Sequence, residues 1–295
     1  MVVVNIWNPE HLSWLVALPT ALLLGMVHGI TPDEHTWPIT FSYSVGSYSS
    51  RGGRRAGFLF SLSFTLQRAV ASELAYFALT SFELSARWQF IVYLVVGAVM
   101  WASGRYILRA GKAARLEMGS HHAGLPERSR WLPLVHGFIA GWGIGAFATI
   151  IYTVLAPAMP SAWLGWVPGL LFGLGTMVMQ ILLGGVFGSW MARRNLSEKA
   201  RAYVARTVSG RTLKGGGIAF MVVAGLGLTW PRQVANLAVS TPLHIHNLHN
   251  LGAGFFLAVI ALFGVAAWAF VKSRREALQL FGSPSGAAPG SSPLP

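Results

Sequence analysis

The sequence has 295 residues, of which 54% are hydrophobic and only 11% are charged. This composition is too apolar for a soluble domain of that length, so we expect an integral membrane protein. The formal charge of +13 would suggest a nucleic-acid partner only if the protein were soluble. Because the sequence contains no cysteine, disulfides, thiolate metal ligands and thiol redox chemistry are excluded.

Seven apolar segments are long enough to cross a hydrocarbon core, which takes about 20 residues. The predicted fold class is therefore all-α, a polytopic membrane protein with about seven transmembrane helices. The segments lie near 12–31, 57–80, 88–108, 132–157, 163–191, 215–231 and 250–272.

The basic residues are distributed unevenly between these segments. If the segments alternate in direction, nearly all arginines and lysines lie on one side, which the positive-inside rule identifies as the cytoplasm. We expect a multi-pass protein of the cell (inner) membrane, with its N-terminus outside and its C-terminus cytoplasmic. The excess charge then reflects topology and contact with the anionic lipids of the bilayer, and no nucleic-acid partner is expected. The oligomeric state is left open.

Two stretches of the sequence resemble each other. "HGITPDEHTWPITFSY", from His28, and "HGFIAGWGIGAFATIIY", from His136, share an opening His-Gly-apolar and a closing Tyr. Because their segments would cross in opposite directions, this similarity predicts a 3+3 inverted repeat plus one helix, an arrangement common in transporters. The depths do not match, since His28 lies late in its segment and His136 lies early.

This arrangement predicts one transmembrane domain and a short tail. The domain covers 1–281, with repeat-like halves at about 12–108 and 132–231 and an extra helix at 250–272. The run at 282–295 is rich in Gly, Ser, Pro and Ala, so we expect a disordered cytoplasmic tail.

The stretch directly after the first segment carries the only aspartate of the sequence, beside a proline. As one helix, residues 12–48 would stretch about 55 Å, so this region is broken, re-entrant or more than one crossing. Pro32 lacks an N–H and its ring would clash with the carbonyl of His28, which predicts a break there. Unwinding would bring together imidazoles and carboxylates that suit a divalent transition metal, from His28, Asp33, Glu34 and His35. The alternative is an interfacial loop in which the two acids cap the next helix.

Three further histidines, His244, His246 and His249, precede the last segment on the predicted outer side. They form either a secondary site that captures metal at the mouth of a pathway or a polar interfacial segment. In the second segment, Arg68 and Glu73 are five residues apart, on helix faces separated by about 140°. They are candidates for gating or for structural ion pairs, for instance Arg68 with Asp33.

The motif "HGITPDEH" resembles the first signature of the nickel/cobalt permease family and of related urease-accessory and nickel/cobalt-efflux membrane proteins. It keeps the first His, a Pro-Asp pair and the closing His, but has Thr31 in place of the first Asp and is one residue longer at Glu34. Two later motifs, "FSLSFT" and "GFIAGWGIGAFAT", resemble further family motifs, with three departures at Phe64, Gly145 and Thr149. The resemblance implies a permease.

We therefore expect a permease that moves a divalent transition-metal ion and is not an enzyme. The ion would be Ni or Co, with Zn and Fe as alternatives, and no cofactor would be permanently bound. The ligands would be His28, Asp33 and His35, with Glu34 and His136 as secondary candidates. Two alternatives stay open: an intramembrane metal-dependent hydrolase that uses Asp33 or Glu34 as general base, and an exporter of anions or organic solutes with Arg68 as counter-charge.

Overall fold

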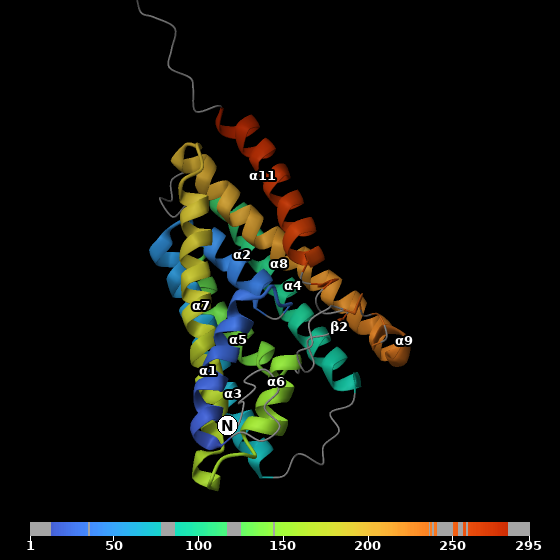
Figure 1. The fold of residues 1–295 in the computed structure, drawn as a ribbon. Helices are drawn as coiled ribbons and strands as arrows, with labels where there is room; N and C mark the ends of the chain where they lie inside the picture. The colour runs from blue at the N-terminus through green and yellow to red at the C-terminus, as the bar shows by residue number, and fades with distance from the viewer. Residues whose placement is uncertain are drawn as a thin grey trace, which may run out of the picture.

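The computed structural model describes residues 13–34, 36–77, 86–116, 125–143, 145–235, 237, 239–240, 250–252, 256–257 and 259–282. The candidate ligand His35, the three outer histidines His244, His246 and His249, and the predicted tail beyond Gly282 lie outside these ranges. Within them the chain is almost entirely helical, which confirms the all-α class (Figure 1). One antiparallel pair, β1 (Val239–Ser240) with β2 (Asn250–Leu251), is the only strand pairing in the described part.

The helices follow the predicted apolar segments in chain order. The first part of the chain forms α1 (Trp14–Ile30), α2 (Trp37–Ser47), α3 (Ser50–Tyr76) and α4 (Ala86–Leu116). After a 3-10 turn at Glu127–Arg130 come α5 (Leu132–Ala140), α6 (Ala146–Ile150), a π-helical turn at Ile151–Leu155 and a 3-10 turn at Ala162–Leu164. The chain continues as α7 (Trp166–Ala192), α8 (Glu198–Thr229), α9 (Pro231–Ala235), a π-helical turn at Ile260–Val265 and α11 (Ala266–Phe281).

The first predicted break is confirmed. α1 ends at Ile30, and Thr31 has extended backbone angles (φ −73°, ψ 134°) because the residue before a proline disfavours the helical region. The Thr31 backbone N–H and hydroxyl both donate to the carbonyl of Val27, at 3.0 and 2.6 Å, and close the last turn of α1. The chain resumes a helix at Trp37, with Pro38 in its first turn, where a missing N–H costs nothing.

A second break lies in the segment 132–157, which we expected to be continuous. α5 stops at Ala140, and α6 begins only after an extended Gly145. Three glycines at alternate positions, Gly141, Gly143 and Gly145, remove side-chain support for a helix here, since glycine is the poorest helix former after proline. The fourth segment is therefore two short helices joined by a glycine-rich turn.

Three helices of the described part are long and apolar enough to cross a membrane: Trp88–Ala110, Ala162–Ala192 and Glu198–Thr229. Their outward faces carry exposed aliphatic side chains such as Leu182, Val186 and Val222, which is the pattern of a helix surrounded by lipid. α1 adds a shorter apolar helix of 17 residues. The protein is therefore a membrane protein.

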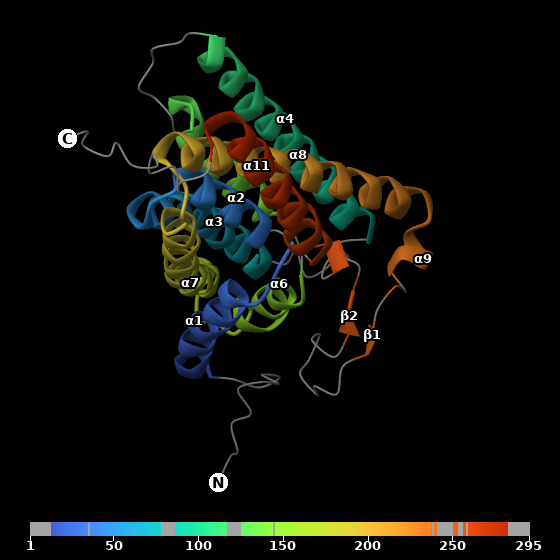
Figure 2. The same ribbon diagram turned by 90° about the horizontal axis from the view of Figure 1, so that it is seen from above.

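The helices pack in two groups. α3 and α7 share the most extensive interface, with α1 against α7 and α5 against α3, while α8 packs on α4 and α11 (Figure 2). α2 bridges the groups by contacting α3, α7 and α8. The α3–α7 backbones touch at Gly53 and Gly184, where a Cβ on either residue would overlap the carbonyl of the other. Small residues therefore set the closest approach, as is common between membrane helices.

Some of these close contacts form pairs that are related by a constant difference in residue number. Gly25 of α1 packs on the backbone of Phe172 in α7, and Gly137 of α5 packs on the backbone of Phe60 in α3. The separation along the sequence is the same between the two glycines as between the two phenylalanines. The two contacts are therefore related by one constant offset in sequence number.

The interface between α3 and α7 repeats at the same step. Gly57 packs on the backbone of Gln180, and Gly169 packs on the backbone of Arg68. The separation in sequence from Gly57 to Gly169 equals that from Gly25 to Gly137. The separation from Arg68 to Gln180 is the same. α4 and α8 are in contact through the pairs Gly97–Gly217 and Gly104–Gly210. The separation from Gly97 to Gly210 equals that from Gly104 to Gly217, and it is one residue longer than the separation found between α3 and α7.

Candidate functional site

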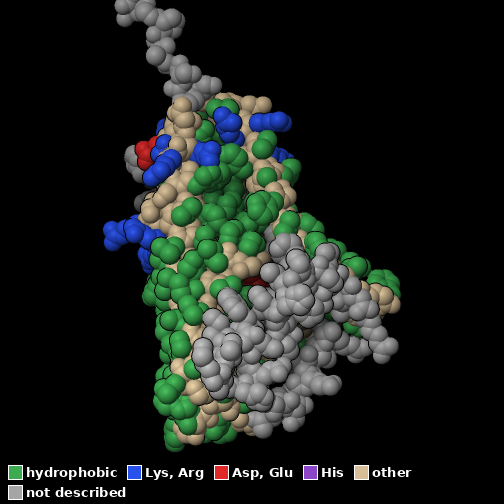
Figure 3. Space-filling model, viewed as in Figure 1, with side chains coloured by type: hydrophobic (Ala, Val, Ile, Leu, Met, Phe, Trp, Pro, Cys, Tyr) green, Lys and Arg blue, Asp and Glu red, His purple; other side chains and the backbone are tan. Residues whose placement is uncertain are grey.

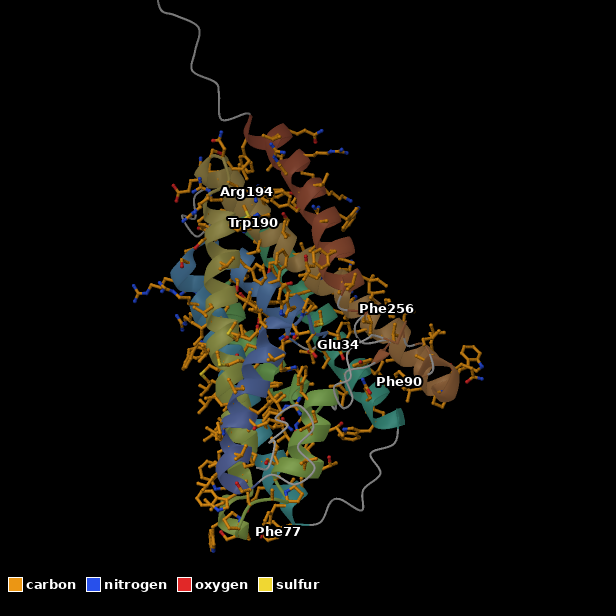
Figure 4. All side chains as sticks on the ribbon, in the orientation of Figure 1. Glu34, Phe77, Phe90, Trp190, Arg194 and Phe256 are labelled. Carbon is orange, nitrogen blue, oxygen red and sulfur yellow. The ribbon has the colours of Figure 1, made fainter. Side chains whose placement is uncertain are left out.

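The first break lies deep in the bundle. Glu34, in this break, is midway along the bundle, between Phe77 at one end and Arg194 at the other (Figure 4). His28 and Glu34 are both buried, with 6% and 7% of their surface exposed. Ionisable groups at such a depth in a membrane protein are costly and mark a functional site by default.

His28 and Asp33 lie close together at this break. The distance from His28 Nδ1 to Asp33 Oδ2 is 3.8 Å. The break explains this approach, since an unbroken helix would place residues five positions apart on different faces. An imidazole beside a carboxylate is an arrangement that can bind a divalent transition-metal ion or hold a proton.

An aromatic enclosure surrounds the imidazole of His28. Its ring centroid lies 5.8 Å from that of Phe64, 5.5 Å from Phe147 and 5.1 Å from Phe172, which belong to α3, α6 and α7. Because the three rings come from three different helices, the orientation of His28 depends on how these helices pack. Movement between the helices would therefore change the site directly.

Glu34 contacts α4. Its Oε1 accepts a hydrogen bond of 2.7 Å from the hydroxyl of Tyr93, and Gln89 Nε2 donates to the same hydroxyl at 2.7 Å. The alternative prediction was that the two acids cap the next helix. Thr36, and neither acid, occupies the N-cap position of α2. Glu34 thus connects the break to α4.

His136 lies on α5, against α2. Its Nδ1 is 2.9 Å from the carbonyl of Leu132 on the same helix and 3.4 Å from the hydroxyl of Tyr43. The carbonyl accepts only, so Nδ1 carries the proton in this arrangement. The described residues contain no group of three or more His, Asp or Glu side chains able to hold a metal. His136 is therefore not gathered with His28 and Asp33.

Arg68 is buried and holds the second break. Its Nη1 donates to the Tyr152 hydroxyl at 2.6 Å, and its Nη2 donates to the carbonyl of Gly143 at 3.0 Å. The guanidinium carbon lies 4.7 Å from the ring centre of Phe64 and 5.7 Å from that of Phe172. The same two rings contact His28, so the arginine and the histidine belong to one aromatic enclosure.

The predicted ion pairs of Arg68 and Glu73 do not form within the described part of the chain. Arg68 has only neutral hydrogen-bond partners and aromatic faces there, and the Oε2 atom of Glu73 is buried against Gly165 without a hydrogen bond. The two side chains cannot reach each other because they leave α3 on different faces. Arg68 is thus a buried cation with no carboxylate beside it among the described residues.

Sequence reasoning missed several polar residues around the two breaks. Gln180 of α7 is fully buried, and its Nε2 donates to the carbonyl of Gly29 at 2.9 Å. Tyr93 and Tyr152 hold Glu34 and Arg68, respectively. Single polar side chains inside apolar segments were the available signal, because burial of such groups demands a partner.

The hydrolase alternative required His28 to converge with His35 and one outer histidine. All of these except His28 lie outside the described residues, so this hypothesis stays a prediction. Comparisons with protein families, with curated proteins and with solved structures found no match. The functional argument therefore rests on the residues and geometry of this chain.

Proposed function

We propose that this chain is a multi-pass permease that moves a divalent transition-metal ion such as Ni²⁺ or Co²⁺ through the break between α1 and α2. The observation that carries the proposal is the approach of His28 to Asp33 at a broken helix in the middle of the bundle. Transporters place ion sites at discontinuous helices because unwound backbone and side chains there can replace the water around an ion.

The ligand set has the right chemistry for such a cargo. Neutral imidazole and carboxylate together suit borderline divalent ions, and both groups must be deprotonated to bind. His28 and Asp33 supply two ligands, and the predicted third is His35. Glu34, held by Tyr93, adds a second carboxylate beside the pathway.

The proposed architecture is seven crossings, with spans one to three and four to six as inverted repeats. Two sets of contacts support it: α1 packs on α7 in the manner of α5 on α3, and the α3–α7 contacts repeat at the same step. The glycine contacts also show that α1 runs parallel to α7 and antiparallel to α3, as alternating crossings require. The proposed C-terminal span is the extra helix.

The contact register changes the alignment of the halves. It matches Gly25 with Gly137, so His28 corresponds to Ala140 and not to His136. This removes the difference in depth between the two histidines that the sequence similarity left unexplained. Only the first half then carries ligands at its break, and the second break is held by Arg68.

A second candidate cargo is an anion or an acidic organic solute, and one observation favours it. Arg68 is a buried cation with only neutral partners in the described part of the chain, and its Nε has no hydrogen bond. A buried charge without a counter-charge is costly unless a ligand supplies one. The permease architecture would be the same, with the substrate charge reversed.

Flux into proteoliposomes separates the two cargoes. For metal transport we expect Ni²⁺ and Co²⁺ uptake to fall about tenfold or more in His28→Ala, Asp33→Asn and His35→Ala, since even outer-shell partners of a metal contribute that much to affinity. Glu198→Gln, which removes an exposed carboxylate at the start of α8, is the matched control and should transport normally. The anion proposal would replace the metal proposal if the wild type took up sulfate or succinate but no metal, and if Arg68→Gln abolished that uptake.

A further inference from the structure

A hollow of about 660 Å³ lies between α3 and α7, away from both helix breaks. It is at the end of the bundle where α3 begins and α7 ends, the region in which Figure 3 shows many of the Lys and Arg side chains. Its polar lining comes from three arginines and two serines: Arg54, Arg193, Arg194, Ser50 and Ser189.

Among the residues that the structure describes, no acid neutralises the arginines of this hollow. No carboxylate belongs to its lining, and none of the three pairs with an acid among the described residues. The guanidinium carbon of Arg194 lies 4.2 Å from the ring centre of Trp190 and 5.6 Å from that of Phe270 on α11. Stacking holds its planar guanidinium in place while its N–H edges stay available for an anion.

The floor of the hollow is a glycine. A Cβ on Gly185 would come within 3.0 Å of the Cγ of Arg54, so the glycine lets the stem of that arginine lie across α7. The serine hydroxyls of Ser50 and Ser189 line the same space. The result is a concave site whose lining carries several hydrogen-bond donors.

One side of the hollow is apolar and continues along the bundle. Leu182 and Val186 line it, and they are 56% and 60% exposed on successive turns of α7. Both lie on the same face as Trp190, Val186 one turn before it and Leu182 two turns before it. A ligand that fills the whole hollow therefore has an anionic group at the basic end and a hydrocarbon chain beside α7.

We propose that this hollow binds an anionic phospholipid, with the phosphate between Arg54 of α3 and the arginine pair after α7, and one acyl chain against Leu182 and Val186. A zwitterionic lipid brings its own cation to the phosphate and is the poorer match. A free anion would make no use of the apolar side. Bound in this way, the lipid joins the start of α3 to the end of α7, the two helices with the largest interface.

This inference rests on the chain being a membrane protein and not on the identity of the transported substrate. The test is thermal unfolding of the purified full chain in detergent with added phosphatidylglycerol, phosphatidylcholine of the same acyl chains, or inorganic phosphate. We expect phosphatidylglycerol alone to raise the melting temperature. Loss of two arginines in Arg54→Gln/Arg194→Gln should weaken its apparent affinity by roughly thirtyfold, from the usual contribution of each basic residue near an anionic lipid.

The matched control is Arg105→Gln. Arg105 is exposed and, like Arg194, stacks on a tryptophan, with its guanidinium carbon 5.2 Å from the ring centre of Trp101, but it lies on α4 outside the hollow. This variant should respond to phosphatidylglycerol as the wild type does. Leu182→Gln keeps every charge and should weaken the lipid effect through the acyl chain alone.

Three outcomes would overturn the proposal. Equal stabilisation by phosphatidylcholine would show that the headgroup charge is not recognised, and equal stabilisation by phosphate would identify a soluble-anion site. If Arg105→Gln reduced the stabilisation by phosphatidylglycerol as much as the double variant does, the stabilisation would be a general charge effect. Because each variant is compared with its own lipid-free melting temperature, a destabilised variant still gives a result.

Discussion

Arg68 of α3 and Gln180 of α7 make matching hydrogen bonds at the two helix breaks. Arg68 Nη2 donates to the carbonyl of Gly143 at 3.0 Å, after α5, and Gln180 Nε2 donates to the carbonyl of Gly29 at 2.9 Å, near the end of α1. Each bond joins one proposed half of the chain to the other. The donors differ in charge, so a cation holds one break and a neutral amide holds the other.

The hydrogen bonds of Arg68 lead to a prediction about stability. In Arg68→Ala the Tyr152 hydroxyl and the Gly143 carbonyl both lose a buried donor, so we expect the free energy of unfolding to fall by about 2–4 kcal/mol. Arg68→Gln keeps a donor and should lose less. Denaturant or thermal unfolding in detergent measures both. Arg105→Ala, which removes an exposed arginine, should change stability by no more than about 0.5 kcal/mol; a loss as large as that of Arg68→Ala would show that burial of Arg68 contributes nothing.

The helix crossing between α3 and α7 leads to a second prediction. A methyl group at Gly57 or Gly169 would overlap the backbone carbonyl of the facing helix, so Gly57→Ala and Gly169→Ala should each destabilise the protein by about 1–3 kcal/mol through overpacking. Gly225→Ala on α8 is the control, because nothing lies within 4 Å of its Cβ position. There the helix propensity of alanine should leave stability unchanged or raise it by up to about 1 kcal/mol. Equal effects at all three positions would contradict the contact assignment.

The first break was predictable from sequence, and the second was not. Pro32 acts on the residue before it and on the preceding turn, so its effect is local and readable from the chain. The glycines from Gly141 to Gly145 are ambiguous, since membrane helices also use glycine for close packing. The Gly143 carbonyl accepts its hydrogen bond from Arg68, a residue distant in sequence, and no local pattern predicts that partner.

The register between the two proposed halves was not predictable from the sequence. The sequence similarity aligns His28 with His136 because histidine is rare in this chain. The packing contacts depend instead on Gly25 and Gly137. Glycine is frequent in this chain, so a pair of glycines carries little weight in a sequence comparison. Partners of buried polar residues, such as Tyr93 for Glu34, come from other helices, and no local pattern specifies them.

Acidification should reduce metal transport. Imidazole and carboxylate bind a metal only when deprotonated, so flux of Ni²⁺ should fall as the pH is lowered from 7.5 to 5.5 in proteoliposomes without a pH gradient. The loss should be reversed when the pH is restored, which separates titration from unfolding. Level flux across this range would contradict ligation by His28.

The contact between α8 and α11 predicts a pH-dependent stability. Partial burial raises the pKa of Glu276. Hydrogen bonds from Tyr203 and Arg211, at 2.6 and 2.7 Å, lower it by a larger amount, so the pKa lies below its ordinary value. A depressed pKa means that the stabilisation is full above the ordinary carboxyl range and is lost as the pH falls through the lowered value. Glu276→Gln should therefore cost about 1 kcal/mol at pH 7 and progressively less in acid.

A double-mutant cycle isolates that interaction. Arg211→Gln should cost a similar amount, and the double variant should cost less than the sum of the two single variants, since both remove the same pair. Thermal unfolding at pH 7 and at acid pH measures all four proteins. Additive losses, or a loss in Glu276→Gln that does not change with pH, would show that the carboxylate charge does not stabilise this contact.

Because the chain contains no cysteine, its topology is open to single-cysteine labelling. Asn195 directly follows Arg194 at the basic end of the bundle (Figure 4). Ser161 precedes the 3-10 turn that leads into α7, so it lies by the other end of that helix. The positive-inside rule predicts that Asn195→Cys reacts with a membrane-impermeant maleimide only when the cytoplasmic side is exposed, and Ser161→Cys only from outside. The unmodified chain is an unreactive control. Reaction of both residues from one side would contradict a crossing by α7, and the reverse pattern would place the C-terminus outside and invert the proposed topology.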